Sequence, residues 1–136
     1  MNKQYYARTH ADFLNRAFGT NYKQYPRSVW KNPDGVPIWI VHNDGKIRAG
    51  WKTYVYDDKI IEEYVGSNPD KIKPVKKSEY VRIVAKVIDS RVTLLPMYYV
   101  IAGLYSLSIE ESSVAGYRVW RKPSAEGYDV YPYLTY

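Results

Sequence analysis

The sequence predicts an α+β fold in which an N-terminal amphipathic helix packs on a bent, mainly antiparallel β-sheet or small, partly open barrel. Three observations support this. Apolar residues recur at helical spacing in residues 5–18, residues 46–56 and 80–88 alternate as strands do, and turn-forming residues separate these stretches. A chain of 136 residues can bury a core of its own. We therefore expect a single domain over residues 1–136.

Residues 5–18 are predicted to form the helix. An apolar stripe at helical spacing would face the sheet; it consists of Tyr6, His10, Phe13, Leu14, Ala17 and Phe18. Thr9 with Asp12 could cap a shorter helix, and Gly19 is a natural stop. His10 lies on the apolar stripe, so we expect a packed, hydrogen-bonded histidine there.

Residues 20–35 form an irregular segment in which cations alternate with rings. Lys23, Arg27 and Lys31 interleave with Tyr22, Tyr25 and Trp30. This composition suits single-stranded nucleic acid, because rings stack on bases while cations hold phosphates. The same rings could instead pin the loop to the core, and the sequence leaves both interpretations open.

Residues 36–56 are predicted to form the central hairpin. A β-branched and aromatic run, residues 38–42, is followed by Asp44-Gly45, a dipeptide typical of a tight two-residue turn. Alternation from Lys46 to Tyr56 predicts the second strand. In the expected register Ile38 lies opposite Trp51, Ile40 opposite Ala49 and His42 opposite Ile47.

The middle of the chain begins with a segment of ambiguous structure. Residues 57–65 fit either a continued strand or one or two helical turns, and residues 66–77 are predicted to be an exposed, lysine-rich loop. Residues 80–88 read as a strand. Its inward positions would be Val81, Ile83, Ala85 and Val87, and its outward positions Tyr80, Arg82 and Lys86.

The C-terminal third starts with a buried apolar segment. Residues 92–107 could be helix or strands, and their β-branched residues favour strands. Ser108 with Glu111 could cap a short helix. Residues 116–122 and 128–136 are predicted strands, and Pro132 places the last at a sheet edge.

Charge is unevenly distributed along the chain. The net charge is +6, and residues 1–56 carry all of it, with nine Lys and Arg against three acids. This asymmetry suggests attraction to a polyanion, although a mildly basic domain can also arise for solubility alone. The absence of cysteine excludes disulfides and thiolate chemistry. No signal peptide or membrane span is evident, so we expect a soluble cytoplasmic protein, monomeric or homodimeric.

Sequence motifs of the common catalytic classes are missing, but one short pattern resembles a large nuclease superfamily. Pro33-Asp34 followed by Asp44-x-Lys46, or by Asp57-x-Lys59, resembles its Pro-Asp…(Asp/Glu)-x-Lys motif. The resemblance implies two carboxylates that hold Mg²⁺ and a lysine that assists the attacking water. The alternating strand–helix core of that superfamily is not evident here.

A second pattern, in residues 102–105 and 116–122, resembles the end of domains that grip a flipped methylated base. In those domains a Tyr-Asp-Gly-Leu-Tyr strand precedes a closing basic strand. Here Ala102 replaces the aspartate, whereas Gly103, Leu104 and Tyr105 match. The glycine-rich region upstream has no counterpart, and the resemblance covers about a third of the chain.

The function predicted from these observations is non-enzymatic nucleic-acid binding through the basic face of the hairpin, with no metal and no cofactor. The candidate binding residues are Lys23, Arg27, Lys31, Lys46, Arg48, Lys52, Tyr54 and Tyr56. One alternative is a protein-interaction module, of the accessory or inhibitor type found in mobile elements, that binds an acidic partner or a nucleic-acid-processing complex. A Mg²⁺-dependent nuclease is the second alternative.

Overall fold

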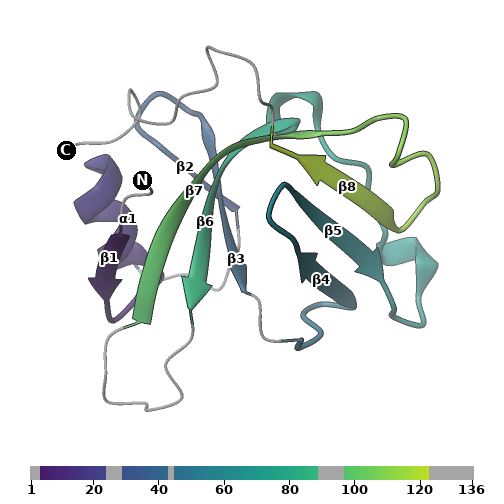
Figure 1. The fold of residues 1–136 in the computed structure, drawn as a ribbon, viewed down its shortest axis with the longest axis horizontal. Coiled ribbons are helices and arrows are strands. Elements are labelled where there is room, and N and C mark those ends of the chain that lie inside the picture. The colour runs from purple at the N-terminus through teal and green to yellow at the C-terminus, as the bar shows by residue number, and fades with distance from the viewer. Residues whose placement is uncertain (1–3, 24–28, 43–44, 89–96, 123–136) are drawn as a thin grey trace.

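A computed structural model describes residues 4–23, 29–42, 45–88 and 97–122 (Figure 1). These ranges contain one α-helix, α1 (His10–Phe18), and a sheet of eight strands. The strands are β1 (Gln4–Ala7), β2 (Val29–Lys31), β3 (Pro37–His42), β4 (Trp51–Val55), β5 (Lys59–Tyr64), β6 (Val81–Ile88), β7 (Met97–Leu107) and β8 (Tyr117–Arg121). Two short 3₁₀ helices, η1 (Pro69–Lys71) and η2 (Lys77–Glu79), lie between β5 and β6. Among these residues no helix has the length and apolar character needed to cross a membrane.

The sheet is open and mainly antiparallel, which confirms the expected class of a helix on an antiparallel sheet. Its strands are ordered β2-β3-β6-β7-β8-β5-β4, and β1 pairs with β7 beside this path. The pairing of β3 with β6 is parallel, and the other strand pairs are antiparallel. Figure 1 shows the sheet bending, with β3, β6 and β7 in one half and β8, β5 and β4 in the other.

The helix is not the first element of the chain, so the prediction for residues 5–18 is wrong at its N-terminal end. Residues 4–7 form β1, in which exposed and buried side chains alternate, and Tyr5 lies opposite Tyr99 of β7. The helix that follows is capped by Thr9, whose side-chain hydroxyl accepts a hydrogen bond from the backbone amide of Asp12. Gly19 adopts the left-handed conformation that closes the helix.

The predicted hairpin of residues 36–56 is also wrong. The partners of β3 are β2 and β6, so Ile38 lies opposite Ile83 rather than Trp51. The alternating run after residue 45 breaks where Ala49 and Gly50 both have positive φ, and Arg48 and Trp51 exchange two backbone hydrogen bonds of 2.9 Å. This geometry is a two-residue turn with positive φ at both centres. Strand β4 starts only after it and pairs with β5, so residues 59–64 of the ambiguous segment 57–65 form a strand, and residues 57 and 58 form the turn before it.

The later strands form within the ranges predicted for them, but some of their side chains differ from the prediction in whether they are buried or exposed. Residues 97–107 form one long strand, and residues 117–121 form β8. In β6, Ile83, Ala85 and Val87 are buried as expected, whereas Val81 is exposed and Arg82 is buried. The outward assignment of Arg82 is therefore wrong, because both faces of this strand are covered. The Ser108 hydroxyl accepts a hydrogen bond from the backbone amide of Glu111, but the residues after Ser108 form a turn and not the predicted short helix. The predicted strand 128–136, the first part of 92–107 and the Asp44 half of the expected turn lie outside the described residues.

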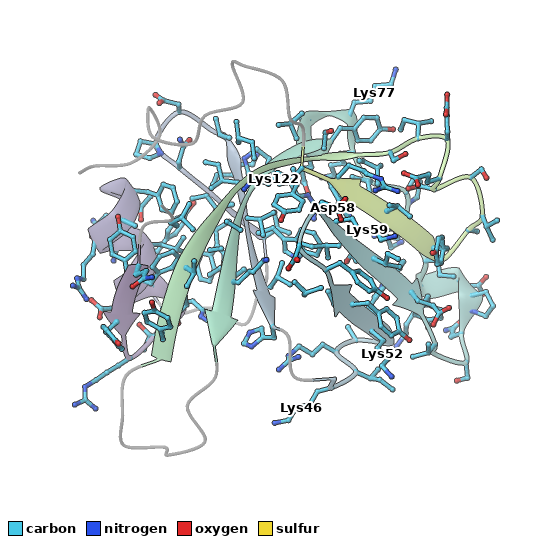
Figure 2. All side chains as sticks on the ribbon, in the orientation of Figure 1. Lys46, Lys52, Asp58, Lys59, Lys77 and Lys122 are labelled. Atoms are coloured by element: carbon cyan, nitrogen blue, oxygen red, sulfur yellow. The ribbon has the colours of Figure 1, made fainter. Side chains whose placement is uncertain are left out.

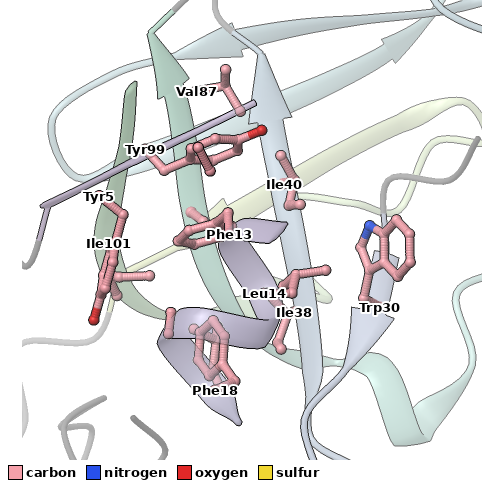
Figure 3. Packing of buried hydrophobic residues seen from close by; sticks show 14 of the residues in the cluster. Tyr5, Phe13, Leu14, Phe18, Trp30, Ile38, Ile40, Val87, Tyr99 and Ile101 are labelled. Atoms are coloured by element: carbon pink, nitrogen blue, oxygen red, sulfur yellow. The ribbon is translucent and has the colours of Figure 1, made fainter. Parts of the chain in front are cut away.

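Two apolar clusters cover the two faces of the sheet. The first lies between the sheet and α1 with β1, and in Figure 3 Phe13 stacks on Tyr99, with ring centroids 4.3 Å apart. Trp30 is buried there and contacts Tyr22, so these two rings do hold the segment after α1 against the core. His10 lies at the border of this cluster and is hydrogen-bonded through Nδ1 to the Tyr99 hydroxyl, 2.7 Å away. The second cluster fills the opposite face, on the inside of the bend.

Candidate nucleic-acid interface

The inside of the bent sheet is called here the inner face. Its apolar cluster draws residues from both halves of the sheet: Trp39, Val41, Ile60, Val84, Ala102, Tyr105 and Trp120. Trp39 of β3 and Trp120 of β8 come from strands that are not neighbours, yet their ring centroids are 5.3 Å apart. The bend is what brings these two rings together.

Arg82 fills the space between these tryptophans. Its guanidinium carbon lies 4.2 Å from the Trp120 ring centroid and 5.3 Å from that of Trp39, and only 6% of the residue is exposed. The same guanidinium group donates to the backbone carbonyl and the carboxylate of Glu79. A buried cation needs such partners, because leaving water without them is costly. Arg82 therefore ties β6 to both halves of the inner face.

A β-bulge interrupts the regular pairing of β7 on the inner face. The register between β6 and β7 shifts between Val84 and Ala85, which leaves Ala102 as an extra residue, and Gly103 has a φ of 128°. Few residues other than glycine adopt this φ. A Cβ atom at Gly103 would lie 3.1 Å from Cε of Lys122, so the Lys122 side chain lies directly over the bulge.

Polar side chains gather around this bulge in what is called here the inner polar cluster: Asp57, Lys86, Tyr105 and Lys122. Burial first, and Lys122 second, lower the pKa of Lys86, and Asp57 opposes them. Burial raises the pKa of Tyr105, and Asp58 and Asp57 raise it further. Asp57 is therefore within electrostatic reach of both Lys86 and Tyr105, and Lys122 is within reach of Lys86.

The turn between β4 and β5 supplies the acids of this region. The Tyr56 amide donates to the Lys59 carbonyl, which makes Asp57 and Asp58 the two turn residues, and the Lys122 amide donates to the Asp58 carbonyl. Lys59 Nζ lies 5.2 Å from the Tyr56 ring centroid. Asp58 also pairs with Arg121, with 3.8 Å between the charged groups. Figure 2 shows Lys122 and Asp58 near the middle of the molecule, with Lys59 beside them.

The residues predicted as a binding patch from sequence do not share one face. Lys46 and Arg48 are exposed and lie before the Ala49-Gly50 turn. Lys52 and Tyr54 lie on the outer side of β4, where Lys52 is opposite Glu63 and the Tyr54 hydroxyl contacts the Glu63 carboxylate at 3.3 Å. The positive charge of Lys52 is therefore balanced by the carboxylate of Glu63 on the neighbouring strand.

The remaining predicted site residues are spread over the ends of elements. Tyr56 is exposed at the β4–β5 turn, next to the inner polar cluster. Lys31 ends β2, the strand at the other end of the sheet order from β4, and Lys23 is exposed after α1. Arg27 lies outside the described residues.

The carboxylates of the nuclease-like pattern lie in separate turns. Asp34 is exposed in the turn between β2 and β3, whereas Asp57 lies in the turn between β4 and β5. Among the described residues no three His, Asp or Glu side chains come close enough together to hold a metal ion. Asp44 lies outside the described residues.

Sequence reasoning missed Lys86 and Lys122 as candidate site residues. Lys86 was placed on the outward side of its strand, because it shares that side with Arg82 and two cations on one side are typical of a solvent-exposed face. Tyr105 and Gly103 were present in the resemblance to base-gripping domains, and the structure places both on the inner face. The signal for this site lay in that glycine within an otherwise apolar strand, which is typical of a bulge.

Comparisons with known proteins place the fold beside one restriction enzyme. No protein-family model and no curated protein matches the sequence. Among solved structures, the chain is similar to the 5-hydroxymethylcytosine-specific restriction enzyme AbaSI, with a TM-score of 0.63 and 22% identity. The similarity covers 90% of this chain and 38% of that protein, so the chain spans well under half of its length. At this identity the similarity establishes the fold alone.

Proposed function

We propose that this chain is a non-enzymatic nucleic-acid-binding module that contacts its ligand on the inner face of the sheet. The observation that carries the proposal is the pair of lysines, Lys86 and Lys122, that share the inner polar cluster over the Gly103 bulge. From the residues predicted by sequence, Tyr56 lies at the turn that carries Asp57, and Lys46 and Arg48, exposed in the segment before β4, would add phosphate contacts outside the inner face.

The energetic argument rests on Lys86, a half-buried cation that lies near the exposed Lys122. Burial first, and the charge of Lys122 second, lower the pKa of Lys86, while Asp57 opposes them, so an anion bound beside Lys86 would stabilise its charged form. A phosphate group is a suitable anion, because it accepts hydrogen bonds from several donors and pairs with lysine as a point charge. Phosphate contacts would supply most of the affinity, which makes binding strongly dependent on salt.

The fold supports DNA as the first ligand to test. The similar solved structure is that of a restriction enzyme named as specific for 5-hydroxymethylcytosine, which is a modified DNA base. In this chain Gly103 and Tyr105 stand at matching positions of the base-gripping pattern, and Gly103 lies beneath the Lys122 side chain. Tyr105 is 1% exposed and Gly103 is buried, so a base turned out of the helix would reach them only after Lys122 has moved aside.

The test is fluorescence anisotropy with labelled double-stranded DNA, single-stranded DNA and RNA oligomers. We expect Lys86→Gln combined with Lys122→Gln to weaken binding about tenfold or more, because each lost phosphate contact removes favourable charge interaction. A matched control is Lys71→Gln combined with Lys77→Gln, which removes two exposed lysines between β5 and β6. Equal losses in both double variants, or none in the first, would overturn the assignment to the inner face.

A second experiment tests whether the protein distinguishes between bases. Duplexes that differ by cytosine, 5-methylcytosine or 5-hydroxymethylcytosine at one position are compared on the same protein. A preference that disappears in Tyr105→Phe, while general affinity remains, would identify Tyr105 as a base contact.

The nuclease alternative rests on Asp34 and requires its own assay. Cleavage of these oligomers in Mg²⁺ or Mn²⁺ that is abolished by Asp34→Ala would replace the non-enzymatic proposal with the enzymatic one. Absence of cleavage with both metals, at concentrations that saturate binding, would retire the alternative.

A further inference from the structure

A cavity of about 500 Å³ lies at an end of the molecule remote from Lys46. Its walls are the segment around η1 and η2, which precedes β6, and the loop between β7 and β8. The apolar lining comes mainly from Ile72, Val75, Leu107, Ile109 and Val114, with two tyrosine rings, Tyr80 and Tyr117. Figure 2 shows Lys77, from one wall, at the opposite side of the molecule from Lys46. A cavity of this size accommodates one or two large apolar side chains.

The cavity has an apolar rim that water reaches. Ile109 is 59% exposed and Val114 is 67% exposed, and both line the opening. Large apolar side chains that gather around a hollow, rather than being scattered singly, are typical of an interaction site. The floor continues into the inner apolar cluster through Val75 and Leu107, which pack against it.

The surroundings of the cavity are positively charged. Exposed lysines follow the wall before β6: Lys71, Lys73, Lys76 and Lys77. Arg118 also lines the cavity; its guanidinium stacks on Trp51 at 4.3 Å and donates to the Lys73 carbonyl.

Two nearby acids do not offset these cations, because other groups already engage them. Glu79 pairs with Arg82, and Glu111 makes two hydrogen bonds to Arg121. Asp70 and Glu110 remain exposed near the opening. Five cations against these two carboxylates leave the rim with an excess of positive charge.

We propose that this cavity binds an acidic peptide segment of a protein partner. A leucine or phenylalanine side chain of the peptide would enter the cavity, and carboxylates on either side of it in the peptide would contact the lysines. The aliphatic lining favours a side chain over a nucleotide, since nucleic acid would stack on flat rings and place its phosphates on the lysines. The apolar anchor accounts for the cavity, and flanking carboxylates account for the lysine-lined wall. The cavity adjoins the apolar part of the inner face but does not include the inner polar cluster, so this proposal does not depend on the nucleic-acid proposal.

The experiment uses a short fluorescein-labelled peptide with Leu and Phe between Asp and Glu residues. Its controls are the same peptide with Ala in place of Leu and Phe, and the same peptide with Lys in place of the acids. Anisotropy reports the affinity, and methyl NMR reports where the peptide binds. We expect binding by the first peptide only, with shifts in the methyl groups of Ile109, Val114 and Leu107.

Two variants test the site on the protein. Val114→Asp places a negative charge on the apolar rim, and Lys73→Glu combined with Lys76→Glu reverses the charge of the wall; we expect each to weaken binding about tenfold. The matched control is Ile47→Asp, because Ile47 is 60% exposed, similar to Val114, but lies next to Lys46. This control is expected to leave peptide affinity within about twofold.

The outcomes separate the two proposals. Equal binding of the Ala-substituted peptide, no binding of the acidic apolar peptide, or an equal loss in Ile47→Asp would each overturn the docking site. Oligonucleotide binding that is lost in Val114→Asp, without peptide binding, would assign the cavity to nucleic acid instead. Failure of the inner-face lysine variants would leave the peptide result unaffected.

Discussion

At the scale of single residues, Arg82 is the side chain on which the inner face depends. It is almost fully buried, lies against two tryptophan rings and donates to Glu79. We predict that Arg82→Ala lowers the free energy of unfolding by about 3 kcal/mol, because the variant loses the buried charge pair and both ring contacts. Urea denaturation followed by tryptophan fluorescence measures this change.

The control for this prediction is another arginine of the sheet, in β8. Arg121 also pairs with a glutamate, Glu111, but that pair lies at the surface. Arg121→Ala should change stability little, since exposed ion pairs contribute little in water. Similar losses in the two variants would contradict a special role for Arg82.

His10 makes stability depend on pH. Burial first, then the charges of His42 and Arg48, lower the pKa of His10 to about 4, from an ordinary value of 6.5. The unfolded chain therefore binds a proton below about pH 6.5, whereas the folded protein does so only near pH 4. The free energy of unfolding should fall between these values as pH falls, by about 2 kcal/mol because part of the ring meets water.

The measurement is urea denaturation of the native protein and of His10→Gln at pH 7 and pH 4.5. Removal of the titrating group should flatten the loss over this range, and an NMR titration of His10 gives its pKa directly. An unchanged loss in His10→Gln would show that other groups are responsible.

At the scale of elements, the Ala49-Gly50 turn determines where β4 starts and which strand it meets. Gly50 has a φ of 86°, and a Cβ atom there would lie 2.5 Å from Cε1 of Tyr64. Gly35 has almost the same φ, 84°, with nothing within 4 Å of a Cβ position. We predict that Gly50→Ala costs at least about 1 kcal/mol more than Gly35→Ala, because the first change adds a clash to the shared backbone strain.

Thermal and urea denaturation of both variants measure this difference. The matched φ values cancel the conformational contribution, so the remainder reports the contact with Tyr64. Equal losses would mean that Tyr64 moves aside without cost.

The same turn explains why the central hairpin was mispredicted. Asp44-Gly45 is a strong local turn signal, and a run that alternates after it is the ordinary pattern of a hairpin. Nothing in local propensity shows that Ala49, a residue that seldom adopts positive φ, takes the first turn position. The position of the turn depends on the pairing of β4 with β5, whose last residue is Tyr64, and β5 is remote from the turn in sequence.

At the scale of the whole molecule, the uneven charge distribution predicts how nucleic-acid binding responds to salt. If Lys46, Arg48, Lys86 and Lys122 contact phosphates, the logarithm of affinity falls about 0.9 times the number of these contacts per logarithm of salt. From 50 to 200 mM salt we then expect a loss of about a hundredfold or more. A salt titration of anisotropy checks this, and a nearly flat response would contradict phosphate contact.

Much of the architecture was accessible from sequence, whereas the site was not. Alternation located β6 and β8, and helical spacing located α1, because these signals are local. Local patterns could not show that the side of β6 that carries Arg82 and Lys86 is covered, since this depends on the bend that brings Trp120 over β6. Likewise, Lys122 gains its place over Gly103 through the bulge in β7, and no spacing in the sequence encodes that approach.

The parallel pairing of β3 with β6 also governs how the chain must be made. Ile38 pairs with Ile83, so the apolar strand 37–42 leaves the ribosome about two to nine seconds before its partner, at about 5–20 residues per second. Over this interval β3 is an uncovered strand rich in Ile, Trp and Val, which is the kind of segment that pairs with other chains. Slow translation or premature termination before residue 81 would therefore yield aggregates, and folding should be limited by the closure of this long loop rather than by the formation of α1.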